Sequence, residues 1–73
     1  MSVQEDRDMT ANDLLNKGSK KVAQWSKRNG YIVACDYEQG ENYVVEFAKV
    51  CAGITIESVT VVFSSNDRVI EVK

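Results

Sequence analysis

The feature that most limits how this chain can fold is the contrast between its β-rich part and its single helical segment. From Tyr31 onward, apolar residues occupy both alternating sets of positions in the strand-like segments. A sheet covered on one face alone alternates apolar and polar side chains instead. The chain has 73 residues, and one helix in so short a chain cannot cover two sheet faces. We therefore expect something else to cover the second face.

The N-terminal part of the chain predicts one amphipathic helix over residues 10–29. Thr10 is an N-cap residue with Asp13 three positions later, an arrangement related to the capping box. Apolar residues then recur at helical spacing in a stripe centred on Trp25, which we expect in the core. The pair Asn29-Gly30 is typical of a helix end.

Four segments rich in β-branched and aromatic residues follow, at residues 31–38, 43–51, 54–63 and 68–73. Turn-forming residues separate them at 39–42, 52–53 and 64–67. This order predicts an α+β fold, in which the N-terminal amphipathic helix packs on a three- to four-stranded antiparallel meander. The alternative is a small bent β-barrel with the helix capping one end. We assign residues 10–73 to a single domain and residues 1–9 to a flexible acidic tail.

Apolar residues on the second face of the strands form a candidate protein interface. They are Ile32, Ala34, Val44, Ala48 and Val50. The run from Val50 to Ile56 contains no charge, and such a run promotes aggregation when it is exposed. A two-fold homodimer would cover this face. A β-bulge near Lys49 or Glu57 is the alternative, because one extra residue moves the following side chains to the other face.

Simple alternation also assigns the faces of the first strand. It places Val33, Cys35 and Tyr37 on one face and Ile32 and Ala34 on the other. Tyr37 and Tyr43 flank the first turn, where they form either an aromatic contact patch or a cross-strand pair.

No residue pattern indicates catalysis or cofactor binding. The chain has no His, the base that Ser-His-Asp and Cys-His systems need. Cys35 and Cys51 are not grouped with other ligands, so we expect no metal site and interpret both as small buried apolar residues with reduced thiols. The glycines form no phosphate-binding loop. With no apolar run typical of a signal peptide or membrane span, the sequence predicts a cytoplasmic, non-enzymatic protein without a cofactor.

The basic residues gather on one flank of the predicted helix, although the net charge of the chain is −2. They are Lys17, Lys20, Lys21, Lys27 and Arg28. Such a flank is a candidate contact for the phosphates of nucleic acid, or simply a solvated helix face. The opposite flank, formed by Ser19, Ala23 and Ser26, is small and uncharged. It either admits the backbone of a partner or remains a neutral exposed surface.

Together these features predict a small protein-binding module that acts as an adaptor, regulator or inhibitor. We expect it to work as a homodimer or with an unidentified protein partner. Nucleic-acid binding through the basic flank is the alternative. Neither a membrane nor a small-molecule substrate is expected as a partner.

Overall fold

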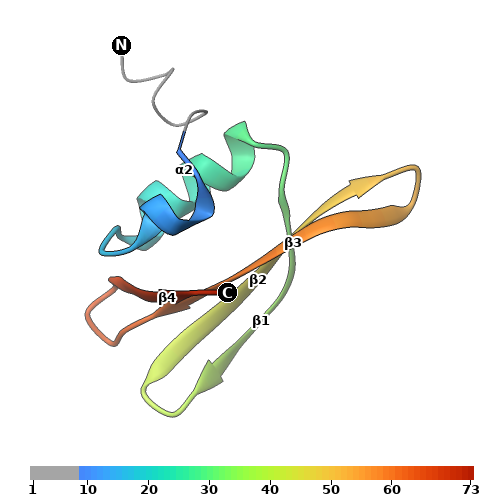
Figure 1. Cartoon of the computed structure of the whole chain (residues 1–73). Coiled ribbons are helices and arrows are strands. Elements are labelled where there is room, and N and C mark those ends of the chain that lie inside the picture. Colours follow the sequence, from blue (N-terminus) through green and yellow to red (C-terminus); the bar gives the residue numbers. More distant parts are fainter. Residues whose placement is uncertain (1–8) are drawn as a thin grey trace.

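The computed structural model describes residues 9–73 and has the predicted order of elements (Figure 1). These are the 3-10 helix η1 (Ala11–Leu14), the α-helix α2 (Ser19–Arg28) and the strands β1 (Ile32–Gln39), β2 (Asn42–Cys51), β3 (Ile54–Phe63) and β4 (Val69–Val72). The strands form one antiparallel sheet in the order β1-β2-β3-β4. The α+β meander is therefore confirmed. Because the sheet is open, the barrel alternative is wrong.

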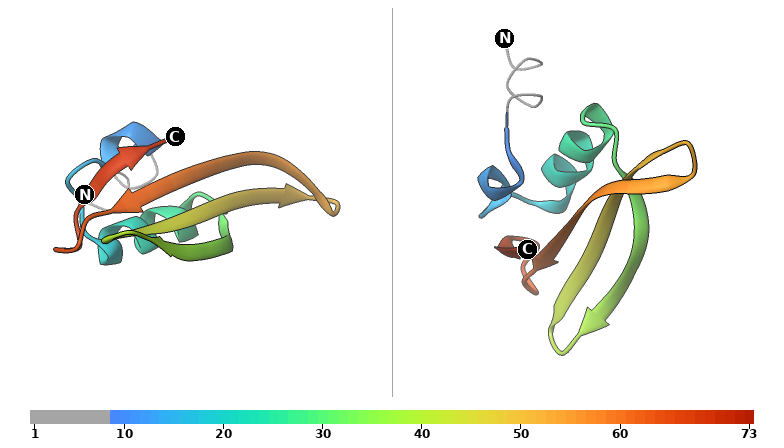
Figure 2. Two further views of the ribbon diagram at one scale, coloured as in Figure 1. Left: turned by 90° about the horizontal axis from the view of Figure 1, so that it is seen from below. Right: turned by 45° about the vertical axis from the view of Figure 1, so that its right-hand side comes forward.

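Both helices lie on the same face of the sheet (Figures 1 and 2). The core forms between them and this face, from Leu14, Val22, Trp25, Tyr31, Phe47, Val59, Val61, Phe63 and Val69. Trp25 is buried as predicted and stacks on Tyr31, with ring centroids 5.0 Å apart. Its indole N–H donates to the carbonyl of Met9 at 2.8 Å. Met9 is the one residue of the predicted tail that the structure describes.

The prediction of one continuous helix over residues 10–29 is wrong, because the helix is interrupted at residues 15–18. The backbone of Asn16 takes a positive φ of 69°. Its N–H donates to the carbonyl of Val69, and the N–H of Val69 donates to the carbonyl of Lys17, both at 2.9 Å. These bonds to β4 satisfy backbone groups that a continuous helix would have paired internally. Tertiary pairing therefore overrides the helical periodicity here.

The two helical pieces have different N-terminal caps. At η1 the capping contact predicted from Thr10 and Asp13 is confirmed, since the Asp13 carboxylate accepts the Thr10 backbone N–H at 2.9 Å. At α2 the N-cap residue is Gly18, which has no side chain to offer. Instead the Asp67 carboxylate, from the turn between β3 and β4, accepts the backbone N–H of Ser19 at 3.3 Å and its hydroxyl at 3.2 Å. A residue distant in sequence therefore helps to set where α2 begins.

Bulges in the sheet decide which side chains share a face. The register shifts between Lys49 and Val50, as the bulge alternative predicted. It also shifts between Val33 and Cys35, so that Ala34 has no direct partner in β2. Val33 lies opposite Phe47 on the helix side, whereas Cys35 lies opposite Glu46 on the other face. The prediction that Val33 and Cys35 share a face is therefore wrong, because simple alternation fails across a bulge.

Candidate functional site

The most exposed apolar surface of the described chain is the hairpin between β2 and β3, which extends beyond the helices (Figures 1 and 2). We call residues 50–56 the hairpin arm. Each of these uncharged residues is exposed, with Val50 at 45%, Ile56 at 60% and Ile54 at 66%. Ala52 and Gly53 form the turn with φ values of 54° and 79°, the left-handed conformation of tight two-residue hairpins. The arm therefore presents β-branched side chains that the rest of residues 9–73 does not cover.

A compact polar cluster marks the base of the arm, where charged residues return. The Tyr31 hydroxyl donates to Glu57 Oε2 at 2.7 Å, and Lys49 Nζ lies 3.7 Å from Glu57 Oε1. Lys49 Nζ also lies 4.8 Å from the centroid of the Tyr31 ring, a cation–π contact. Burial, followed by the hydrogen bond and charge of Glu57, raises the pKa of Tyr31 to about 12. These contacts link β2, β3 and the residue before β1. They therefore fix the position of the strands from which the arm projects.

A second surface is a groove of about 500 Å³ between α2 and the β1–β2 hairpin. Its α2 wall includes Ser19, Ala23 and Ser26, the small flank noted in the sequence. Its apolar floor includes Val45 and Phe47. The groove exists because α2 packs against the core through the larger Val22 and Trp25, while its small residues face β1 and β2. A groove of this size and lining is typical of binding sites.

The charged groups along this groove are acidic. Asp36 lines it from β1, and Asp67 lines it where it meets the turn between β3 and β4. Tyr43 donates its hydroxyl to the Asp36 carboxylate, and this hydrogen bond, with burial and the acidic charges nearby, raises the pKa of Tyr43. Among the described lining residues, none is Lys or Arg. The groove therefore combines an apolar floor with acidic residues on its β1 side and at the β3–β4 turn, while Lys20 and Lys27 lie beyond Ala23 and Ser26 on α2.

The groove lies next to an open sheet edge. β1 is the first strand of the sheet, and within residues 9–73 no strand pairs with its outer side. At the opposite end, Asn16 and Lys17 bond to Val69 and cover the outer side of β4 at that residue. An unpaired strand edge offers its backbone N–H and C=O groups to another strand. Of the two sheet edges, β1 is the longer and more accessible.

The five residues predicted as a protein interface differ in their exposure to solvent. Ile32, Ala34 and Val50 are exposed. Val44 and Ala48, at 1% and 6% exposure, are buried even though no described helix covers their face of the sheet. The two tyrosines near the first turn lie on opposite faces of the sheet. Tyr37 lies opposite Val44, and Tyr43 lies opposite Glu38 in the next pair along the strands. They therefore share neither an aromatic patch nor a cross-strand pair.

The basic residues remain together on the solvent side of the helical segment. Lys20, Lys27 and Arg28 are exposed on α2, Lys21 is half-buried, and Lys17 lies just before the helix. Lys20 and Lys27 also border a second hollow of about 490 Å³, which includes Tyr31 and shares Ala23 and Ser26 with the groove. There is no acidic residue within α2, so this surface is uniformly positive.

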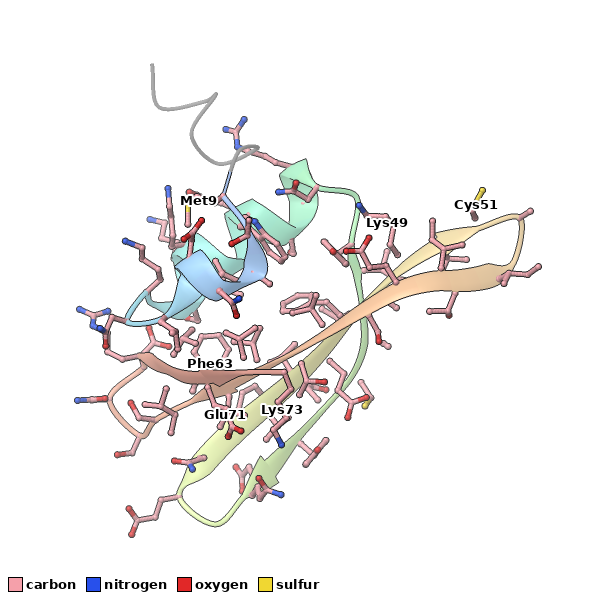
Figure 3. All side chains as sticks on the ribbon, viewed as in Figure 1. Met9, Lys49, Cys51, Phe63, Glu71 and Lys73 are labelled. Carbon is pink, nitrogen blue, oxygen red and sulfur yellow. The ribbon has the colours of Figure 1, made fainter. Side chains whose placement is uncertain are left out.

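Both cysteines are exposed and free, so the prediction that they are buried is wrong. Cys51 belongs to the projecting arm, and the bulge at Ala34 turns Cys35 toward the face that has no described helix. Partial loss of solvent around the thiol, followed by the hydrogen bond and charge of Glu46 and the charge of Asp36, raises the pKa of the exposed Cys35. In the described part of the chain, no three His, Cys, Asp or Glu side chains are grouped as a metal site. Figure 3 shows the described side chains as sticks, with Cys51 on the arm, away from the helices.

No protein-family model, no curated protein and no solved structure matches this chain. None of the helices formed by residues 9–73 is long and apolar enough to cross a membrane. Sequence reasoning pointed to the arm through its uncharged run. It missed the groove, for which the small flank of the helix was the one available signal.

Proposed function

We propose that this chain is a non-enzymatic protein-binding module that acts as a homodimer joined through the hairpin arm. The observation that carries the proposal is the exposure of every residue in the uncharged run from Val50 to Ile56. Contiguous exposed apolar surface marks interaction sites in proteins that stay in solution. Two-fold dimers are the commonest way to cover such a surface, because each copy offers the same patch to the other.

The energy available from the arm supports this proposal. Full burial of an isoleucine side chain stabilises by about 1.5 to 3 kcal/mol. Ile54 and Ile56 are 66% and 60% exposed, so each would add about 1 to 2 kcal/mol if a second copy covered it. A two-fold contact uses each residue twice. The resulting gain of about 4 to 8 kcal/mol is similar to the lower end of the cost of association, so the two isoleucines offset much of that cost and the other apolar residues of the arm have to supply the net affinity.

Light scattering across a concentration series tests the proposal. We expect the unmodified chain to approach the mass of a dimer, and the double variant Ile54→Lys/Ile56→Lys to remain a monomer at every concentration. Ile70→Lys is the matched control, because Ile70 is also exposed but lies in β4, outside the arm. It should dimerise like the unmodified chain. A monomeric unmodified chain, or a double variant that still dimerises, would refute the proposal.

The proposal includes a cytoplasmic location and a role as adaptor, regulator or inhibitor. Cys35 and Cys51 are free, exposed thiols, which persist in reducing compartments.

Nucleic-acid binding through the basic flank is the second candidate function, favoured by an α2 that has basic residues and no acidic ones. Binding of this kind weakens steeply as the salt concentration rises, because phosphate contacts release counterions. We expect Lys20→Glu/Lys27→Glu to abolish binding to a single- or double-stranded oligonucleotide at low salt. Glu71→Lys, a charge change of the opposite sign on β4, is the control for non-specific charge effects. Absence of binding at low salt by the unmodified chain would eliminate this candidate.

A further inference from the structure

We propose that the groove between α2 and β1 binds an extended, positively charged peptide segment of another protein, which pairs with β1 as an additional strand. This site is separate from the hairpin arm and does not depend on self-association. Three features of the structure support it: an open strand edge, an apolar groove beside that edge, and the acidic residues that β1 places next to both.

The edge has the length and position that strand addition requires. β1 has 8 residues, and at about 3.3 Å per residue it matches a peptide of similar length. All of its residues are exposed, and its only strand partner in the described chain is β2 on the inner side. Backbone hydrogen bonds from an added strand give affinity that depends little on the peptide sequence. Specificity then comes from the side chains that the peptide directs toward the protein.

The groove supplies a place for those side chains. Val33 and Asp36 of β1 belong to its lining, so a strand added outside β1 would direct alternate side chains toward α2. The facing wall of α2 is formed by Ser19, Ala23 and Ser26, whose short side chains leave the volume of about 500 Å³ open. The floor at Val45 and Phe47 is apolar, and it therefore favours aliphatic side chains at these alternate positions.

Charge decides between a second copy of this chain and a basic partner. Asp36 and Asp67 line the groove, and Glu38 shares the same sheet face, since it lies opposite Tyr43. Antiparallel pairing of β1 with another β1 would bring Asp36 and Glu38 close to the same residues of the second copy, and β1 contains no basic residue to balance them. Like charges across a strand pair are destabilising. A peptide with Lys or Arg among its aliphatic residues instead complements the site.

Titration of the isotopically labelled chain with a defined peptide, followed by amide NMR shifts, tests the proposal. The probe is a capped ten-residue peptide in which valine alternates with lysine and threonine. We expect saturable shifts confined to residues 32–39 and to the side of α2 that contains Ala23, with a dissociation constant below about 1 mM. The same peptide with glutamate in place of lysine should bind at least about tenfold more weakly. N-methylation of the amides on one edge of the lysine peptide should also abolish binding, because methylated amides cannot pair with β1.

Protein variants separate this site from the arm. Asp36→Lys and Ala23→Leu should each weaken binding about tenfold, the first by reversing the charge and the second by filling the groove. Glu71→Lys, a charge reversal on the sheet face without a described helix, should leave the affinity unchanged. The arm variant Ile54→Lys/Ile56→Lys should also bind the peptide normally, so a failure of the dimer proposal does not affect this test. No saturable shifts, shifts confined to the arm, or equal affinity for the glutamate peptide would overturn the inference.

Discussion

Replacing Tyr31 by phenylalanine tests the polar cluster at the base of the hairpin arm, and the expected effect depends on pH. Tyr31 is 9% exposed, and its hydroxyl donates to Glu57. Its pKa rises from 10.0 to about 12, first because of burial and then because of the hydrogen bond and charge of Glu57. Between these values the unfolded chain has lost the tyrosine proton while the folded chain keeps it. The free energy of unfolding therefore falls as the pH rises from about 10 to about 12.

The size of this effect follows from the shift in pKa. One unit corresponds to about 1.4 kcal/mol, so Tyr31 contributes at most about 2 to 3 kcal/mol below pH 10, and this contribution is lost by about pH 12. Tyr31→Phe has no proton to lose at this position and should lack that part of the pH dependence. At neutral pH the variant should be less stable by about 1 to 2 kcal/mol, because the Glu57 carboxylate loses a donor.

Urea unfolding followed by Trp25 fluorescence measures both effects, with the unmodified chain and Tyr31→Phe compared at neutral pH and at about pH 11. The stability difference between the two proteins should shrink as the pH rises. Tyr37→Phe, which removes an exposed hydroxyl from β1, is the matched control and should follow the unmodified chain. If the difference between the unmodified chain and Tyr31→Phe stays constant from neutral to alkaline pH, the assignment of the raised pKa to Tyr31 is wrong.

Two further predictions concern how the helices are held. Asp67→Ala should lower the free energy of unfolding by about 1 to 2 kcal/mol, because it removes the acceptor for Ser19 and leaves alanine at a positive φ. Asp67→Asn should cost less than half as much, and equal losses in urea unfolding would contradict the capping role. Leu14→Ala should lower the thermal midpoint strongly, through a loss of about 2 to 5 kcal/mol, because Leu14 is fully buried between η1 and the sheet. The exposed Leu15 provides the control, since Leu15→Ala should change stability by less than about 0.5 kcal/mol in the same calorimetric scan.

The strands and turns could be predicted closely from the sequence because their signals are local. The four strand segments differ from the predicted ones by one residue or less at each end. Asn29 and Gly30 end α2 as expected, with Gly30 at a φ of 80°. A β-branched run or a glycine at a positive φ affects its own few residues in any tertiary context. Such features can therefore be recognised without knowing what they contact.

The interruption of the helix could not be predicted in this way. Residues 11–28 have apolar residues at helical spacing throughout, but Asn16 and Lys17 pair with Val69, which lies more than fifty positions later in the chain. The contact therefore depends on the place of β4 in the folded sheet, which local helical spacing does not indicate. Similarly, the sequence predicts only a turn at Asp67, whereas in the structure its carboxylate caps α2.

The α+β order, the positions of the turns and the uncharged run of the hairpin arm all follow from the amino-acid sequence, because composition and short-range periodicity are properties of single segments. Which of the apolar residues are exposed depends instead on how the strands pair and pack. The bulges at Ala34 and next to Lys49 change the face that the following side chains occupy, and a bulge is defined only by the pairing of two strands. For the same reason the groove beside β1 was not predictable: it depends on how far α2 lies from the sheet, which the buried Val22 and Trp25 set through their packing.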